Sequence, residues 1–513
     1  MADQSIEQTE AQIEQAAALQ AHLAGDRHRP RYHFMPPAAW MNDINGALFW
    51  RGRYHIFYQI NPHGAYWHRI QWGHASSVDL VHWVHHPVAL EPDPHGPDRV
   101  GCFSGGALVS KEGVPTLIYF GNPDGVCIAE SHDDLLIHWT RHPDNPVIPQ
   151  PREGDADFGR YEVHDPCAWL DGDTYYAAVN RRHPNGAGDA AYLFKSQDLR
   201  RWRFVDTFYR SRREWTEPDE DCAVPDFFPL GDRHMLLFCS HLQATQYYLG
   251  DLRGERFHPR VHGRMSWEGG QLGGPRTLLD GAGRRIFFDW VREILGEERE
   301  RAAGWSGVMT LPRILGLAAD GTLTIDPAPE VERLRYRHQR RQSLAVADGA
   351  DTVVAGVAGD MLELALEIDS AQAAEVGVAV RCSPDGAEQT PVVYDAWAGV
   401  IRVDVSRSSL DRRIVYYRYR TSSNGRVLMD TLPPNERTVT AQEAPLRLAA
   451  GEPLRLRLFL DRSLLEVYAN GRQCVTQRIY PTRDDAVQVR LLARAGAATV
   501  RRLDAWDLAP AHP

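Results

Sequence analysis

The chain has 513 residues, which is too long for one ordinary domain and comfortable for two or three. Hydrophobic residues make up 43% and charged residues 24%, a composition typical of soluble globular enzymes. The 57 basic residues against 68 acidic ones give a net charge of -11, which argues against a protein that binds nucleic acid through a basic face.

Targeting and metal signals are absent from the sequence. No run approaches the roughly 20 apolar residues that cross a bilayer, and the first residues, rich in Gln and Glu, have no basic-then-apolar start. We therefore expect no membrane association and a cytoplasmic location. The seven cysteines are scattered without CxxC spacing, so we expect neither a zinc site nor a disulfide framework.

Residues 1–30 are predicted to form an N-terminal helical extension. Ser5 to Ala24 are rich in Ala, Gln, Glu and Leu, which favour helices. Gly25 and Pro30 are expected to end the helix.

A hairpin pattern recurs five times over the next three hundred residues. Each copy has an apolar strand, a short turn and a second apolar strand. The copies are Ala47–Gln59, Ala107–Gly121, Ala168–Asn180, Phe227–Ser240 and Thr277–Trp290. We predict an all-β chain with a five-bladed β-propeller over residues 31–326, in preference to a β-sandwich with accidental internal similarity.

A second element repeats out of phase with the hairpins and supports the propeller. It is a Ser/Asp-Leu segment that ends at Trp83, Trp139 and Trp202, with a weaker copy at Phe257. Its interval of about 60 residues is the length of a four-stranded blade with generous loops. We assign the three tryptophans to packing inside the blades.

The repeats fade after Arg313, and the pattern changes in the last third of the chain. Residues 327–343 are predicted as a linker, helical over the charged stretch Glu330 to Arg341. Short alternating strands then predict a β-sandwich domain over residues 344–513. The strongest are Met361–Ile368, Val376–Cys382, Leu454–Leu460 and Leu464–Tyr468, the last followed by the hairpin turn Asn470-Gly471.

Acidic residues precede three of the five hairpins. They are Asp43, Asp165 and the segment Glu220-Asp221. Since the first strand of each propeller blade lines the central axis, we expect these carboxylates to meet in one pocket and to raise one another's pKa. One ionised and one protonated carboxyl group are what the cleavage of a glycosidic bond needs.

Aromatic and amide side chains near the same segments fit a sugar site. Flat rings of Trp67 and Phe103 stack on apolar sugar faces, while Asn42, Gln59 and Ser104 can hydrogen-bond hydroxyl groups. We therefore expect a small carbohydrate as the partner in this pocket.

Several of these segments resemble the signatures of glycoside hydrolase family 32, the invertase, levanase, inulinase and fructosyltransferase group. Trp40 to Gly46 (WMNDING) is similar to its WMNDPNG motif, with Ile44 in place of Pro. The resemblance continues through segments along nearly the whole chain: Tyr54–Pro62, Trp72–Ala75, Phe103–Gly105, Asp165-Pro166, Pro225–Phe228, Trp305–Arg313, Phe459–Ser463 and Glu466–Gly471.

This resemblance implies a retaining reaction on a β-fructofuranosyl unit, on a five-bladed propeller followed by a sandwich. Asp43 would be the nucleophile that forms a covalent fructosyl-enzyme, and Asp165 would hold fructose hydroxyls and stabilise the transition state. A glutamate in the third acidic segment would act as acid and then as base. The resemblance implies that Asn42, Gln59, Trp67, Phe103 and Ser104 line the fructose subsite and that no metal or organic cofactor is needed.

Two departures from the family's pattern affect the site. His164 stands where the family has the Arg of Arg-Asp-Pro. We therefore expect fructose hydroxyls to be bound by a titratable imidazole ring instead of a rigid, permanently charged guanidinium group. The family's motif is Glu-Cys-Pro-Asp, in which Glu lies three residues before Asp. In this sequence Ala223 lies three residues before Asp226. We assign the acid/base to Glu220, with Asp221 and then Glu217 as alternatives.

The leading hypothesis is a glycoside hydrolase that cleaves β-fructofuranosidic bonds in sucrose or short fructooligosaccharides. A fructosyltransferase would use the same intermediate and differ in whether water or a sugar intercepts it. An inverting glycosidase of another furanoside or xyloside, and a sugar-binding protein without turnover, are the remaining alternatives. The sandwich is expected to be a structural prop, and the chain a monomer or a homo-oligomer through that domain.

Overall fold

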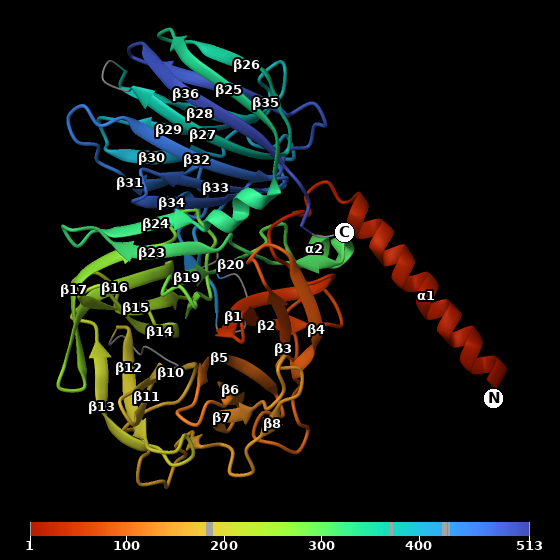
Figure 1. The fold of residues 1–513 in the computed structure, drawn as a ribbon, viewed down its shortest axis with the longest axis vertical. Helices are drawn as coiled ribbons and strands as arrows, with labels where there is room; N and C mark the ends of the chain where they lie inside the picture. The colour runs from red at the N-terminus through yellow and green to blue at the C-terminus, as the bar shows by residue number, and fades with distance from the viewer. Residues whose placement is uncertain (1, 181–187, 370–372, 423–427, 429–430, 512–513) are drawn as a thin grey trace.

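The computed structural model describes residues 2–180, 188–369, 373–422, 428 and 431–511. Strands dominate it, in two bodies that follow one another along the chain (Figure 1). The predicted fold class, an all-β propeller followed by a sandwich, is confirmed.

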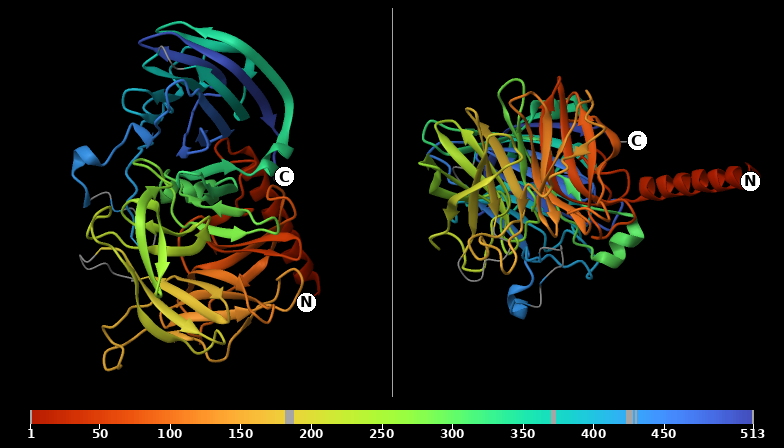
Figure 2. Two further views of the ribbon diagram at one scale, coloured as in Figure 1. Left: turned by 60° about the vertical axis from the view of Figure 1, so that its left-hand side comes forward. Right: turned by 90° about the horizontal axis from the view of Figure 1, so that it is seen from below.

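The first element is the helix α1 (Ala2–Gly25), in the segment where the sequence predicts one. It projects away from both bodies of sheet (Figures 1 and 2). Its C-terminal end packs against the rest of the chain: Leu23 is buried, and His22 Nε2 lies 3.1 Å from the carbonyl oxygen of Ala302. Within the described residues, no helix has the length and apolar character needed to span a membrane.

Five antiparallel sheets form the blades. The first contains β1 (Ala39–Trp50), β2 (Arg53–Asn61), β3 (Gln71–Ser77) and β4 (Trp83–Leu90). The second contains β5 (Gly101–Val109), β6 (Pro115–Asn122), β7 (Gly125–Glu130), β8 (Thr140–Arg141) and β9 (Ile148–Pro149). The third contains β10 (Pro166–Asp171), β11 (Thr174–Asn180), β12 (Ala190–Ser196) and β13 (Arg203–Arg210).

The fourth blade has four consecutive strands, whereas the fifth carries an insertion between its second and third strands. The fourth contains β14 (Ala223–Leu230), β15 (Arg233–Ser240), β16 (Ala244–Arg253) and β17 (Arg256–Arg264). The fifth contains β18 (Arg276–Leu279), β19 (Arg285–Phe288), β23 (Arg313–Leu317) and β24 (Leu323–Pro327). An insertion in the fifth contains β20 (Trp290–Val291), α2 (Glu297–Ala303), β21 (Trp305–Ser306) and β22 (Val308–Met309).

Each of the five predicted hairpins coincides with the first two strands of a blade, which confirms the repeat. The first strands β1, β5, β10 and β14 contact one another in succession, and β18 contacts β1. Between β14 and β18, Asp226 Oδ2 accepts hydrogen bonds from the backbone and the hydroxyl of Thr277 at 2.7 Å. The first strands therefore surround a common axis, as expected for a propeller.

The ring is held together between its last and first blades. Strand β21, from the insertion in the fifth blade, pairs in parallel with β1 of the first, with Ala39 opposite Trp305. This contact ties a segment that follows β19 to the strand that carries Asp43, so closure of the ring and placement of the site depend on the same strand.

The repeated tryptophans mark one kind of turn between the third and fourth strands of the first three blades. Trp83, Trp139 and Trp202 each donate a hydrogen bond from Nε1 to the carbonyl of the leucine three residues earlier, at 2.8–3.2 Å. Each of these leucines has a positive φ, between 57° and 65°. The tryptophans therefore serve the blades and not the pocket, in agreement with their predicted packing role.

The second body is a sandwich of two six-stranded sheets. One contains, in sheet order, β25 (Arg335–Val346), β36 (Ala498–Leu508), β27 (Met361–Asp369), β32 (Leu454–Asp461), β33 (Leu464–Ala469) and β34 (Gln473–Arg478). The other contains β26 (Asp351–Ala358), β35 (Gln488–Arg494), β28 (Glu375–Cys382), β29 (Thr390–Asp395), β30 (Val400–Asp404) and β31 (Ala441–Pro445). The four strands predicted most strongly are β27, β28, β32 and β33, and Asn470-Gly471 forms the turn to β34 with both residues at positive φ.

The predicted helical linker over 327–343 is not what the structure contains. One short 3-10 helix, η1 (Pro329–Leu334), follows β24, and β25 begins at Arg335, inside the predicted linker. The charged residues of Arg335–Val346 are mostly exposed along an edge strand that pairs only with β36 in its sheet. Charges on an edge strand protect it from pairing with other chains, and the same charged composition also favours a helix, so the predicted helix is wrong here.

An apolar cluster and a buried ion pair join the two bodies. Phe459, Leu464 and Leu508 of the sandwich belong to the same cluster as the first and fifth blades. In addition, the fully buried Arg313 of β23 pairs with Glu466 of β33 at 3.2 Å. The sandwich is therefore joined to the propeller at its first and fifth blades.

Candidate active site

A pocket lies where the first strands of the blades converge, and all five blades contribute to it. The contributions are Asn42 and Asp43 from β1, Phe103 and Ser104 from β5, His164 and Asp165 before β10, Ala223 and Val224 from β14, and Gly273 and Gly274 before β18. Of the site residues predicted from the sequence, Asp43, Asp165, Asn42, Gln59, Trp67, Phe103, Ser104 and His164 line this pocket. Glu220 is absent from the lining.

Asp43 lies at an irregularity in the first strand. The register between β1 and β2 shifts between Met41 and Ile44, and such bulges turn a side chain away from the regular alternation. The loop before β18 packs tightly against it: Ile44 donates its N–H to the carbonyl of Gly274 at 3.1 Å. A Cβ at Gly274, whose φ is +121°, would lie 2.6 Å from Asp43 Oδ1, so this close packing requires a glycine.

A chain of hydrogen bonds leads to the Asp43 carboxylate. Trp40 Nε1 donates to Asn42 Oδ1 at 2.8 Å, and Asn42 Nδ2 donates to Gln59 Oε1. Gln59 Nε2 donates to Ser104 Oγ at 2.7 Å, and Ser104 Oγ donates to Asp43 Oδ2 at 2.6 Å. Every donor points toward the carboxylate, so the chain holds it in one orientation and favours its charged form.

The pKa values of the two pocket aspartates are shifted in opposite directions. Burial raises the pKa of Asp43, and the nearby charge of Asp165 raises it further, against the opposing hydrogen bond from Ser104. Burial also raises the pKa of Asp165, but the charge and hydrogen bond of His164 and the Val224 N–H lower it below the ordinary value. The expectation that the carboxylates raise each other's pKa thus holds for Asp43 alone.

Asp165 is held from two sides. His164 Nδ1 lies 3.1 Å from Asp165 Oδ2, and the Val224 N–H donates to the same oxygen at 3.2 Å. Val224 has a φ of +49°, which is strained for a β-branched residue and lies within the bulge between Ala223 and Asp226. The His164 ring packs on Phe120, with ring centroids 4.8 Å apart, so its position is fixed by the second blade.

Aromatic rings form the walls of the pocket. Trp67 meets Phe103 edge to face, with ring centroids 5.9 Å apart, and Trp40 lies 6.0 Å from Trp290. Trp290, from β20, is a lining residue that the sequence argument did not identify. Flat apolar rings beside amide and carboxyl groups are the combination that binds sugars.

Glu220, predicted as the acid/base, is placed elsewhere. Its side chain is buried, and both carboxylate oxygens are occupied: Oε1 accepts from the Glu217 N–H at 2.8 Å and Oε2 from Gln246 Nε2 at 2.6 Å. Gln246 belongs to β16, further out in the fourth blade. The structure therefore does not bring Glu220 together with Asp43 and Asp165.

His241 occupies the region of the pocket next to Ala223. It directly follows β15, whose Cys239 pairs with Ala223 of β14, and it lines the pocket. Asp221 Oδ2 lies 2.5 Å from His241 Nδ1, and Asp221 Oδ1 accepts the His241 N–H at 2.9 Å. His241 is not among the residues predicted from the sequence, although a polar residue at the end of the second strand of a hairpin lies next to the start of the first.

The sandwich also reaches the pocket. Tyr419 and Thr421, from the segment between β30 and β31, line it together with Arg292. The Thr421 N–H donates to the carbonyl of His241 at 2.7 Å. A Cβ at Gly273 would lie 2.2 Å from the Tyr419 hydroxyl, so the two domains meet tightly here. The second domain, expected to be only a structural prop, therefore contributes to the site.

Chemically, the pocket combines two carboxyl groups of different pKa with a histidine and flat rings. Two such carboxyl groups can attack and stabilise an anomeric carbon, and the histidine can move a proton. Among the described residues, no group of three or more His, Cys, Asp or Glu side chains is placed to hold a metal ion.

The chain matches two sequence models of one family. The model described as "Glycosyl hydrolases family 32 N-terminal domain" matches residues 33–327, and "Glycosyl hydrolases family 32 C terminal" matches residues 330–507. The change from one model to the other falls at η1, between the propeller and the sandwich.

Curated relatives are similar along nearly the whole chain. A sucrose-6-phosphate hydrolase of Escherichia coli is 30% identical, covering 94% of this chain and 96% of its own length. A levanase of Bacillus subtilis is 29% identical, covering 95% of this chain and 71% of its own length.

Solved structures have the same fold. Fructan 1-exohydrolase IIa from Cichorium intybus superposes with a TM-score of 0.80 at 24% identity, covering 95% of this chain and 98% of that one. A sucrose-6-phosphate hydrolase from Lactobacillus gasseri gives a TM-score of 0.75 at 20% identity, covering 97% of each chain.

Proposed function

The chain belongs to glycosyl hydrolase family 32, and on this basis we propose that it is a retaining β-fructofuranosidase that cleaves sucrose or short fructooligosaccharides. The observation that carries the proposal is the placement of Asp43 and Asp165 in one pocket at the axis of the propeller, walled by aromatic rings. A retaining glycosidase needs a carboxylate nucleophile at such a position.

Asp43 is the nucleophile in this proposal. Its carboxylate attacks C2 of the fructosyl unit, the bond from C2 to the leaving oxygen breaks, and a covalent fructosyl-enzyme forms. The hydrogen bond from Ser104 keeps Asp43 Oδ2 oriented, and Gly274 leaves the other oxygen room. The raised pKa of Asp43 means that its ionised, attacking form is lost at a higher pH than for an ordinary aspartate.

Asp165 stabilises the transition state. Its lowered pKa keeps it ionised beside the positive charge that develops on the fructosyl ring. His164 holds Asp165 and replaces a guanidinium fork with a ring nitrogen. Asn42, Gln59 and Ser104 are the hydroxyl-binding groups, and Trp67 and Phe103 form the apolar wall of the fructose subsite.

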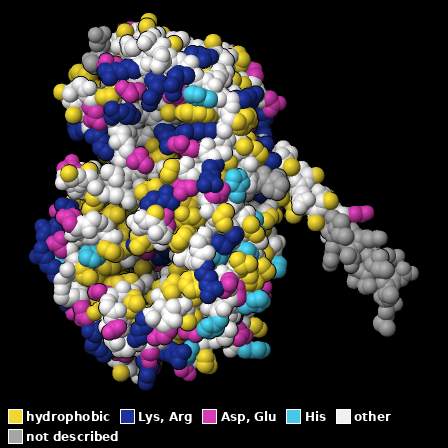
Figure 3. Space-filling model, in the orientation of Figure 1, with side chains coloured by type: hydrophobic (Ala, Val, Ile, Leu, Met, Phe, Trp, Pro, Cys, Tyr) yellow, Lys and Arg dark blue, Asp and Glu magenta, His cyan; other side chains and the backbone are white. Residues whose placement is uncertain are grey.

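The partner is a small carbohydrate and not a nucleic acid. The net charge of -11 opposes binding to the phosphate backbone of nucleic acids, and basic and acidic side chains are interspersed on the face drawn in Figure 3. In this proposal the chain acts alone or as a homo-oligomer through the sandwich.

A cytoplasmic location is part of the proposal. All seven cysteines are free and buried, as is usual for proteins of a reducing compartment. A cytoplasmic enzyme meets imported small sugars, which favours sucrose and short oligosaccharides over polymeric fructans.

The test incubates the purified protein with sucrose, an inulin-type trisaccharide and a levan-type oligosaccharide and separates the products by chromatography. The expected result is free fructose that disappears in Asp43→Asn. Products larger than the substrate would identify a fructosyltransferase using the same intermediate. An absence of product from all three substrates would contradict the proposal.

A further inference from the structure

Among the described residues that line the pocket, no carboxyl group is left for the third role of a retaining glycosidase, proton transfer to the leaving oxygen. At the offset where the family's pattern has a glutamate, the pocket is lined by Ala223, whose methyl group carries no proton. Glu220 has both oxygens engaged away from the pocket. Asp43 and Asp165 are needed for attack and stabilisation.

His241 is placed to fill this gap. Its backbone carbonyl is held by Thr421, and its Nδ1 is held by Asp221, so the ring has one orientation. Its side chain is 26% exposed although it lies in the pocket wall, whereas that of Asp221 is 9% exposed and lies behind it. Within the described residues no hydrogen bond engages its other ring nitrogen, Nε2, which is therefore the nitrogen left for a ligand.

The charge of His241 suits a proton donor. Burial lowers its pKa, but the charges of Asp221, Asp165 and Asp43, together with the Asp221 hydrogen bond, outweigh burial and raise the pKa to about 9. The cation Arg292 and the hydroxyl of Tyr419 line the same pocket. At neutral pH the imidazole is thus protonated.

We propose that His241, oriented by Asp221, is the general acid and base of this enzyme, in place of a glutamate. The inference rests on the proposed function. In the first step Asp43 forms its bond to C2 of the fructosyl unit as the bond to the leaving oxygen breaks, and the Nε2 proton of His241 moves to that oxygen. In the second step Nε2 accepts a proton from water as the water oxygen displaces Asp43 from C2.

His164, the other histidine of the pocket, is less suited to this role. Its Nδ1 is engaged by Asp165, and its Nε2 is buried. The ring packs against Phe120 and Phe103 of the second blade, with centroids 4.8 and 6.1 Å away. The His164 ring therefore serves to hold Asp165, and Asp221 is a positioning residue for His241.

The first test compares two substrates in His241→Gln. On sucrose, whose leaving oxygen needs a proton, kcat/KM is expected to fall by about 10²–10⁴-fold. On 4-nitrophenyl β-D-fructofuranoside, whose leaving group is stable without a proton, formation of the fructosyl-enzyme survives, and added azide accelerates turnover and yields β-fructosyl azide. The matched control is His82→Gln, which removes a histidine paired to Asp79 at 2.9 Å on an outer turn and is expected to leave both activities unchanged.

The second test is the pH profile of kcat/KM, which does not depend on His241→Gln folding. Activity requires protonated His241, so the wild-type basic limb is expected near pH 9. Asp221→Asn keeps a hydrogen-bonding group but removes the charge, and its basic limb moves down toward the ordinary histidine value of about 6.5. Glu220→Gln leaves the limb in place.

The outcomes separate the two proposals. A wild-type enzyme without activity on any fructoside overturns the proposed function and this inference with it. If the wild type is active, two results overturn this inference alone. One is full activity of His241→Gln on sucrose, and the other is a basic limb of the pH profile that does not move in Asp221→Asn. An azide product and a lowered limb together support it.

Discussion

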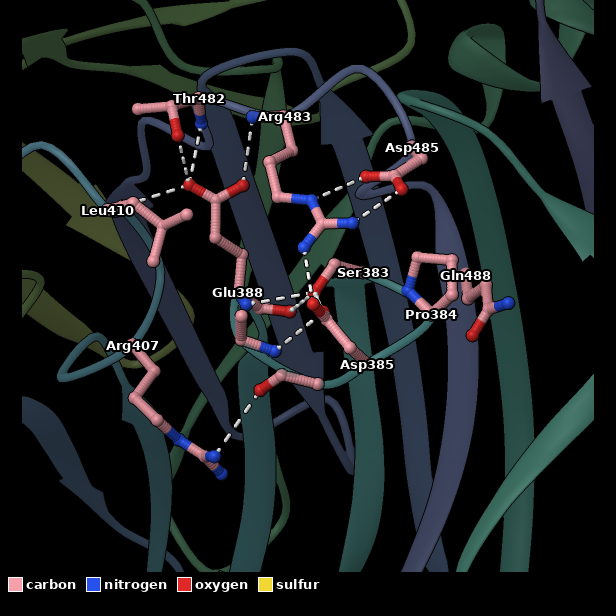
Figure 4. A network of polar contacts seen from close by, with 12 residues as sticks. Ser383, Pro384, Asp385, Glu388, Arg407, Leu410, Thr482, Arg483, Asp485 and Gln488 are labelled. Atoms are coloured by element: carbon pink, nitrogen blue, oxygen red, sulfur yellow. Dashed lines mark hydrogen bonds and ion pairs between the residues drawn. The ribbon is translucent and has the colours of Figure 1, made fainter.

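Two carboxyl groups, the half-buried Asp43 of the propeller and the fully buried Glu388 of the sandwich, have opposite surroundings. Glu388 in the sandwich accepts hydrogen bonds from Leu410 N–H, Thr482 N–H, Thr482 Oγ1 and Arg483 N–H, all at 2.7–2.9 Å (Figure 4). Burial raises its pKa, but these donors reverse the effect and lower it below the ordinary value. Asp43 in the propeller pocket has a raised pKa.

The difference lies in how many donors each carboxylate has and in what it faces. Glu388 is surrounded by protein donors that bind the loops of the sandwich together, so its charge stabilises the fold. Asp43 is held through Ser104 at Oδ2 and faces a cavity, so its remaining capacity is available to a ligand. The number of hydrogen-bond donors thus distinguishes the structural carboxylate Glu388 from the reactive carboxylate Asp43.

The largest effect is expected from Asp43→Asn. Loss of the nucleophile removes the covalent step, so kcat on sucrose should fall by about 10⁵-fold. The midpoint of thermal unfolding should be unchanged or slightly raised, because the substitution removes a charge that its surroundings disfavour, as the raised pKa of Asp43 shows. Initial rates of fructose release and the unfolding midpoint measure the two effects. A variant that keeps a tenth of the wild-type rate would show that Asp43 is not the nucleophile.

Asp165→Asn is expected to have a smaller effect on the reaction. The bond to C2 can still form, but the developing positive charge loses its carboxylate partner, so kcat should fall by about 10²–10³-fold. Steady-state kinetics on sucrose measure this loss. A change in KM alone would mean that Asp165 binds the sugar without stabilising the transition state.

Glu388→Gln tests the other side of the comparison. It weakens a buried set of charge-assisted hydrogen bonds, so the unfolding free energy of the sandwich should fall by about 1–3 kcal/mol. Fructosidase activity of the native protein should not change. Thermal unfolding and initial rates at a temperature below the transition measure both. A loss of activity with unchanged stability would contradict the structural role.

The stabilisation by Glu388 should also depend on pH in a defined direction. Because its folded-state pKa is lowered, its contribution is present above its unfolded pKa of about 4.3 and is lost as the pH falls through the folded value. The gap in unfolding midpoint between wild type and Glu388→Gln should therefore close below about pH 4.

The smallest effect is expected from Ser104→Ala. The Asp43 carboxylate loses one hydrogen bond, so its pKa should rise and the acidic limb of kcat/KM should move up by about one pH unit. The sign follows because the reaction needs ionised Asp43, which is then lost at a higher pH. An acidic limb that moves down, or stays, would show that another group controls it.

Local patterns in the sequence were sufficient for much of the fold. The hairpins come from adjacent strands and short turns, so each could be found without knowledge of the rest of the chain. The same holds for the strands β27, β28, β32 and β33 and for the Asn470-Gly471 turn. The prediction of a helical linker over 327–343 was wrong because an edge strand and a helix can have the same charged composition.

The residues of the pocket were predictable where they immediately precede or begin the first strand of a blade, as for Asp43 and Asp165. His241 and Tyr419 were missed because only the pairing of β14 with β15 and the return of the sandwich to the propeller bring them there. The prediction of Glu220 depends on treating Glu220 to Pro225 as an expanded Glu-Cys-Pro-Asp motif, but the Glu217 N–H and Gln246 of β16 hold its carboxylate outside the pocket lining.

The central claim, a retaining pocket in which Asp43 forms a fructosyl-enzyme, is tested most directly by the stereochemistry of transfer to methanol. Sucrose is incubated with the enzyme in dilute methanol, and the methyl fructosides are identified by NMR, with Asp43→Asn as control. The account predicts methyl β-D-fructofuranoside from the wild type and none from the variant. Methyl α-D-fructofuranoside, or an unchanged yield from Asp43→Asn, would contradict it.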